Sequence, residues 1–140
     1  MTREAIEALF DAREQLLRRR DAAGLAKAHA LDGVVESPIF GTVRGRAAIE
    51  RSYAQLFEGF EDSVFEREQL LIDGDRVAQF FKWHATHTHE MFGFAPTGRQ
   101  FTVHGALVFQ FKDGHIAHER RIYDFTGLLV QIGVLKPRPA

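Results

Sequence analysis

The chain of 140 residues contains no cysteine, and this absence removes several kinds of site at once. Without cysteine there can be no disulfide framework, no thiolate nucleophile and no sulfur ligand for a metal. The net charge of -1 gives no reason to expect nucleic acid or an anionic membrane as a partner. A Gly-rich phosphate-binding motif is also missing, so the sequence does not indicate a nucleotide cofactor.

Long hydrophobic runs are the second thing the sequence lacks. No stretch approaches the ~18 apolar residues that a membrane helix needs, and the first residues are charged and amphipathic. We therefore expect a cytoplasmic protein without a membrane span or a secretory signal. The length predicts one domain, residues 1–140, that is large enough to bury a core of its own.

Phenylalanine is what the chain has in excess, with 13 residues against 2 methionines. Most of these rings should pack in the core. The surplus also suits a protein that walls a cavity for a flat apolar ligand.

Helical patterns occupy the first 60 residues of the chain. Thr2 and Asp21 can cap two helices, of which the first is closed by the basic run 18–20 and the second extends through Leu25 and His29. A short strand at 34–38 and irregular chain at 40–45 separate them from a third helix whose apolar residues run from Ile49 to Phe60.

Strand patterns fill the second half. The turns 73–75 and 112–114, both containing Asp-Gly, predict hairpins. They separate strands at about 64–72, 76–90, 100–111 and 115–124, and residues 91–99 should form a loop. Helices followed by hairpin-linked strands favour an α+β fold with the helices on one face of an antiparallel sheet.

The two central strands carry apolar side chains on both faces. Phe80 alternates with Phe81, and Ala106 and Val108 alternate with larger apolar residues. Only one face can meet the helices, and exposed apolar patches beyond a few hundred Å² are rare on monomers. We predict a homodimer through the outer face of the sheet that buries at least about 1,200 Å² in total.

The run from Arg120 to Gly133 is the most informative segment. A strand with two arginines leads to Asp124, and a short apolar segment follows. A carboxylate at the mouth of a sheet beside a hydrophobic cover could have the pKa that a general base needs. Asp124 could instead cap the following segment. Alternation puts Arg120 on the face of Asp124, where it would lower the pKa of Asp124 or bind an anionic substrate.

Three histidines fall within residues 84–89. Alternation places His87 and His89 on one face, as in strand-borne metal sites, and His104 on the next strand could add a ligand. Hydrogen-bonded histidines at a polar strand end, or one histidine that donates to a ligand oxygen, are the alternatives. We expect no bound metal.

The C-terminal run, together with residues 93–99 and 112–116, resembles the SnoaL-like polyketide cyclases of the nuclear transport factor 2-like and ketosteroid isomerase-like superfamily. In the helical half the likeness rests on residues 38–41 and 44–49. The resemblance implies a cone, the cystatin-like roll, in which a curved sheet wraps around the helices and leaves a pocket. The sequence departs from the family pattern at Arg120 and Arg121, where family members tend to have Trp and an acidic residue.

The resemblance implies an acid/base enzyme, without a cofactor, that acts on a small hydrophobic carbonyl compound. Asp124 would remove a proton next to the carbonyl, giving an enolate for an aldol cyclisation or an isomerisation. His87 or His104 would donate to the enolate oxygen. The substrate-binding residues would be Trp83, Phe40, Tyr53, Phe57 and Arg120.

Two other functions are left open by the sequence. The same fold could serve as a non-catalytic module for small-molecule binding or for dimerisation, because a fold does not fix a function. Asp124 and Arg120 could also take part in the hydration of an epoxide, a reaction for which the second acid cannot be assigned.

Overall fold

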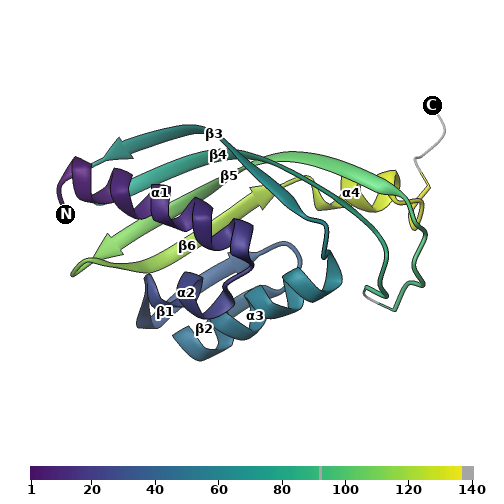
Figure 1. Ribbon diagram of the computed structural model, residues 1–140, viewed down its shortest axis with the longest axis horizontal. Helices are drawn as coiled ribbons and strands as arrows, with labels where there is room; N and C mark the ends of the chain where they lie inside the picture. Colours follow the sequence, from purple (N-terminus) through teal and green to yellow (C-terminus); the bar gives the residue numbers. More distant parts are fainter. Residues whose placement is uncertain (92, 137–140) are drawn as a thin grey trace.

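The protein is described by a computed structural model that covers residues 1–91 and 93–136 (Figure 1). Residue 92 of the predicted loop and the last four residues lie outside the described part. No helix in the described ranges is long and apolar enough to cross a membrane. The elements, in chain order, are α1 (Arg3–Arg19), α2 (Ala22–Lys27), β1 (His29–Ser37), β2 (Gly41–Arg44), α3 (Arg46–Gly59), β3 (Val64–Asp73), β4 (Arg76–Thr86), β5 (Gln100–Lys112), β6 (His115–Tyr123) and α4 (Phe125–Gln131).

The six strands form one curved, unclosed sheet in the order β2-β1-β6-β5-β4-β3 (Figure 1). The predicted α+β cone is therefore confirmed. The sheet is not wholly antiparallel as predicted, because β1 pairs with β6 in parallel. The two hairpins β3–β4 and β5–β6 turn at the predicted Asp-Gly positions.

Side-chain caps begin the first two helices at the predicted residues. The Thr2 hydroxyl accepts from the backbone N–H of Ala5 at 3.1 Å, and the Asp21 carboxylate accepts from that of Gly24 at 2.9 Å. Two boundaries differ from the prediction. His29 begins β1 instead of ending α2, and the region predicted to be irregular contains β2, an exposed four-residue edge strand without an alternating pattern.

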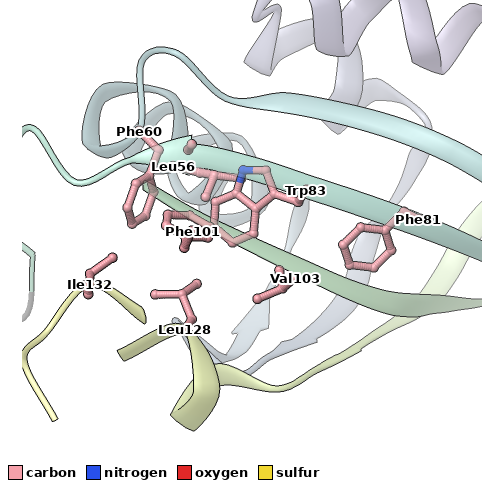
Figure 2. Packing of buried hydrophobic residues seen from close by; sticks show 9 residues of the cluster. Leu56, Phe60, Phe81, Trp83, Phe101, Val103, Leu128 and Ile132 are labelled. Atoms are coloured by element: carbon pink, nitrogen blue, oxygen red, sulfur yellow. The ribbon is translucent and has the colours of Figure 1, made fainter. Parts of the chain in front are cut away.

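The helices α1, α2 and α3 lie over one face of the sheet, while α4 packs at the far end of β5 and β6 (Figure 1). Figure 2 shows the aromatic cluster that joins these parts. Phe60 at the end of α3, Trp83 of β4 and Phe101 of β5 meet edge to face, with Leu128 and Ile132 closing the cluster from the α4 side. This cluster covers the inner face of β4 and β5 near α4.

The outer face of the sheet carries a continuous apolar row. Phe80, Ala106 and Ile122 lie opposite one another on β4, β5 and β6, and Phe80 and Ile122 are 40% and 50% exposed. Val108 on the neighbouring row is also exposed. The sequence-based expectation of a homodimer concerns this surface.

Candidate functional site

A cavity of about 60 Å³ lies between the inner face of the sheet and helices α1 and α3. Its volume is small beside the several hundred Å³ of clefts that hold drug-sized ligands, so a bound ligand would extend to the rim. Aromatic and aliphatic side chains make most of its wall. Three of the four aromatic residues predicted to bind a ligand, Trp83, Phe40 and Tyr53, line it.

Trp83 is held firmly within this wall. Its indole stacks on Phe65 at 5.7 Å between ring centroids and meets Phe101 edge to face at 4.8 Å. The indole Nε1–H donates to the Ser63 hydroxyl at 3.0 Å, which satisfies its only polar group. The fourth predicted residue, Phe57, does not line the cavity and packs behind Tyr53 at 6.2 Å.

Buried charges form the inner end of the cavity. Arg121 donates from Nε to Oε2 of Glu119 at 2.6 Å. Arg13 on α1 approaches the other carboxylate oxygen, with Nη2 at 3.9 Å, and donates to the Tyr53 hydroxyl at 2.9 Å. His29 at the start of β1 lies on the far side of Glu119, with its Nε2 at 3.5 Å from Oε1. Arg13, His29 and Glu119 are all at most 5% exposed.

The pKa values of this cluster fix its charge. Burial on its own would raise the pKa of Glu119, but the positive charges of Arg121 and Arg13 outweigh burial and lower the pKa to about 2. Burial lowers the pKa of His29 to about 4 against the opposing attraction of Glu119. Near neutral pH the cluster thus contains two guanidinium ions, one carboxylate and a neutral imidazole.

Several polar atoms at this end have no protein partner. Among the described residues, Nε and Nη1 of Arg13 and Nη2 of Arg121 are buried without a hydrogen bond, as is Oε1 of Gln79. All three residues line the cavity. Buried polar groups in proteins are almost always satisfied, so these atoms mark an unmet demand for hydrogen bonds beside the cavity.

Tyr123 forms the wall between the charged end and the aromatic cluster. Its ring meets Trp83 edge to face at 5.9 Å. Burial raises the pKa of its hydroxyl, more than the nearby Arg121 charge lowers it, so the group stays protonated. The protonated hydroxyl is hydrogen-bonded to Ser37, which also lines the cavity.

Asp124 does not line this cavity. The strand β6 ends at Tyr123, and Asp124 is the exposed N-cap of α4, where its carboxylate accepts from the N–H of Gly127 at 2.8 Å. This is the capping interpretation that the sequence allowed. Arg120 is 64% exposed, lies on the other face of the sheet from Arg121, and approaches Glu36 at 3.9 Å. The predicted pairing of Arg120 with Asp124 or with a ligand in the cavity is therefore not the arrangement found.

The histidines expected to assist Asp124 also lie outside the cavity lining. His87 is buried in the loop after β4, where its Nδ1 accepts from the N–H of Thr97 at 3.2 Å, and burial lowers its pKa. His104 is exposed on the outer face, 3.0 Å from a carboxylate oxygen of Glu68. None of the three predicted catalytic residues lines the cavity.

The predicted His-x-His geometry does not form because β4 is shorter than expected. Asp62 accepts from both the backbone N–H and the hydroxyl of Thr86, where the strand ends. Beyond that point His87 turns inward, while His89 is 48% exposed and lies 3.3 Å from Glu61. In the described part of the chain no three His, Asp or Glu side chains are placed to bind a metal.

Sequence reasoning missed the importance of Arg13 and Glu119. Arg13 falls on the same helical stripe as Ile6 and Phe10, both fully buried, so a charge within that apolar stripe was an available signal. Glu119 and Arg121 were correctly placed on one face with Tyr123. Which face was buried could not be read from alternation alone.

Comparison with models of protein families identifies a match that spans most of the chain. The profile described as SnoaL-like polyketide cyclase matches residues 7–132. No protein of curated function matches the chain.

Many solved structures share the fold. AclR from Streptomyces galilaeus, a candidate hydroxylase, is 27% identical with a TM-score of 0.79, over 95% of this chain and 87% of its own. IdmH from Streptomyces antibioticus, a candidate polyketide cyclase, is 25% identical with a TM-score of 0.74, over 93% and 96%. TsrD from Streptomyces laurentii is 20% identical with a TM-score of 0.84, over 96% and 99%, and shows likeness of fold alone.

Proposed function

The chain belongs to the SnoaL-like polyketide cyclase family, and on this premise we propose that it is an acid/base enzyme that converts a small hydrophobic carbonyl compound through its enolate. One observation carries the proposal. An aromatic cavity ends at two buried guanidinium groups, those of Arg13 and Arg121, which retain nitrogen atoms without a hydrogen-bond partner in the described part of the chain.

The guanidinium end would stabilise the charge that develops on the substrate. A carbonyl oxygen that accepts from Arg121 or Arg13 becomes an enolate oxygen when the neighbouring carbon loses a proton. Donors already in place, in surroundings of low dielectric constant, favour that negative charge far more than water does. The enolate carbon then attacks a second carbonyl of the same molecule, or takes a proton at another position.

The proton acceptor is assigned to a carboxylate on the cavity wall. Glu14 and Glu66 both line the cavity near its rim. Glu14 lies one residue after Arg13 on α1, with its side chain 27% exposed and 3.4 Å from Arg67. In an aldol closure the same carboxylic acid can return its proton to the new alkoxide, so that the step leaves the enzyme unchanged.

The test is proton exchange into a flat, enolisable ketone. We expect the protein to accelerate the loss of the benzylic C1 hydrogens of 2-tetralone in D₂O, followed by proton NMR. Arg120 and Arg121 are a matched pair, because only Arg121 lines the cavity. The Arg121→Met variant should lose the acceleration and Arg120→Met should keep it. Arg121→Met removes the hydrogen-bond partner of the buried Glu119 carboxylate and could therefore unfold the protein. The double variant Arg121→Met with Glu119→Gln removes that charge as well, so it serves as the folded control.

Equal rates in both single variants, or no acceleration by the unaltered protein, would reject the enolisation mechanism. A second candidate function is then favoured by the exposed position of Asp124, outside the cavity lining. The chain would be a binding module, and 2-tetralone would bind in the cavity without exchanging its hydrogens.

A further inference from the structure

We infer that the inner end of the cavity is an anion site, and that the natural ligand carries an ionised oxygen acid on its flat apolar body. The chemistry shared by such ligands is a delocalised oxygen anion, either an acidic enol such as that of a 1,3-dicarbonyl compound or a carboxylate. This inference rests on the proposed function, which it deepens by naming the substrate class. It concerns Arg13 and Arg121 together.

The buried charges at the inner end of the cavity do not balance. Arg13 and Arg121 each contribute one positive charge, and Glu119 contributes one negative charge. Burial keeps His29 neutral near pH 7, so it adds nothing. One positive charge is left over among side chains that are at most 9% exposed. Such a charge is costly unless it is paired, and an anionic ligand would pair it.

The two guanidinium groups use only part of their hydrogen-bonding capacity within the described residues. Glu119 accepts a hydrogen bond from Nε of Arg121, and the Tyr53 hydroxyl accepts one from Nη2 of Arg13. Nη2 of Arg121, together with Nε and Nη1 of Arg13, remains without a partner in the described chain. Each guanidinium is therefore short of at least one acceptor, and a negatively charged oxygen of a ligand would supply it.

Aromatic rings hold the two guanidinium groups in place. The Arg121 guanidinium carbon lies 5.0 Å from the centre of the Tyr53 ring, and that of Arg13 lies 5.8 Å from the same ring. Arg13 also contacts the Phe109 ring, at 5.3 Å. Groups fixed between aromatic rings need little reordering on binding, which favours affinity for a matching anion.

The rim of the cavity does not repeat this excess of positive charge. Arg67 lies 2.8 Å from Asp11 and 3.4 Å from Glu14. Glu66 lies 3.9 Å from Lys82. Opposite charges at the rim are thus paired with each other, and the attraction for an anion is confined to the inner end.

The experiment compares ionised ligands with their neutral methyl derivatives by isothermal titration calorimetry at pH 7. The enol pair is 2-hydroxy-1,4-naphthoquinone and 2-methoxy-1,4-naphthoquinone. The carboxylate pair is 2-naphthoate and its methyl ester. We expect the ionised member of at least one pair to bind about tenfold or more tightly than its neutral partner. The pair with the larger ratio identifies the acid as an enol or a carboxylate.

Two substitutions should change this preference in opposite directions. Arg13→Met removes the excess charge and leaves Glu119 paired with Arg121, so the preference for the anion should disappear. Glu119→Gln raises the excess charge, so the preference should grow. Loss of folding cannot produce both results. Arg19→Met, an exposed position on the same helix, should leave binding unchanged.

Equal affinity for ionised and neutral members in both pairs would overturn the inference, as would parallel responses to Arg13→Met and Glu119→Gln. These outcomes are separable from failure of the proposed reaction. Anion preference without 2-tetralone exchange would keep the anion site and reject the enolisation step. Exchange without anion preference would keep the enolisation step and reject the anion site.

Discussion

Arg121 donates to Glu119 at 2.6 Å beneath the cavity, while the adjacent Arg120 points to the opposite face of the sheet, where it is exposed. Successive side chains of a β-strand point to opposite faces of the sheet, so these two neighbouring arginines lie on different sides of it. One arginine belongs to the ligand cavity and the other to the outer surface. The sequence-based hypothesis selected Arg120 as a substrate-binding residue, whereas our proposal gives that role to Arg121, which lines the cavity.

We predict that the free energy of unfolding falls as the pH drops from about 6.5 to 4. Burial lowers the pKa of His29 from 6.5 to about 4 in the folded state. A lowered folded pKa contributes stability that is complete above 6.5 and is lost as the pH falls through 4. The loss is at most roughly 3 kcal/mol. Urea titrations across this range measure it.

The control for this prediction is His29→Gln, which cannot titrate and should show a flatter pH dependence between 6.5 and 4. Glu119 would change the free energy of unfolding only at lower pH, because its pKa is lowered from 4.5 to about 2. Its contribution is complete above 4.5 and is lost toward 2. Identical pH profiles of the two proteins would show that His29 does not set this dependence.

Substitution of Asp124 separates its two possible roles. Because its carboxylate caps α4, we predict that Asp124→Ala lowers the free energy of unfolding by about 1 kcal/mol. Asp124→Asn should retain the cap and the stability, since both side chains cap well. Neither variant should change the rate of 2-tetralone exchange. If Asp124→Asn abolished exchange at an unchanged melting temperature, Asp124 would be the base after all.

The exposed apolar row on β4, β5 and β6 leads to a prediction about assembly. We propose that two copies of the chain associate through this face, because Phe80 and Ile122 are large, apolar and 40% and 50% exposed. Light scattering should give the mass of a dimer at micromolar concentration. Ile122→Glu should shift the mass toward a monomer, because a charge in an apolar interface is costly. A monomeric mass for the unaltered protein would refute the proposal.

Local signals allowed much of the fold to be predicted. The caps Thr2 and Asp21 and the two Asp-Gly turns act through bonds between residues two to four positions apart, so the sequence displays them. The end of β4 was missed because Asp62, which binds Thr86, is 24 positions away. No local pattern contains such a contact.

The candidate site was harder to predict for the same physical reason. The aromatic wall followed from composition and resemblance, and Trp83, Phe40 and Tyr53 do line the cavity. The charged end depends on Arg13 of the first helix meeting Glu119 of the last strand. Only the folded chain brings these residues together, and only burial turns their charges into a strong local field.

The central claim is that a ligand binds in the cavity with an oxygen at the buried guanidinium groups. A crystal structure of the protein with 2-hydroxy-1,4-naphthoquinone tests it most directly. We predict that the ring stacks among the aromatic side chains near Trp83, and that an ionised oxygen accepts a hydrogen bond from Nη2 of Arg121 or Nη1 of Arg13. A ligand bound beside Asp124 or on the outer face of the sheet, with both guanidinium groups untouched, would contradict the account.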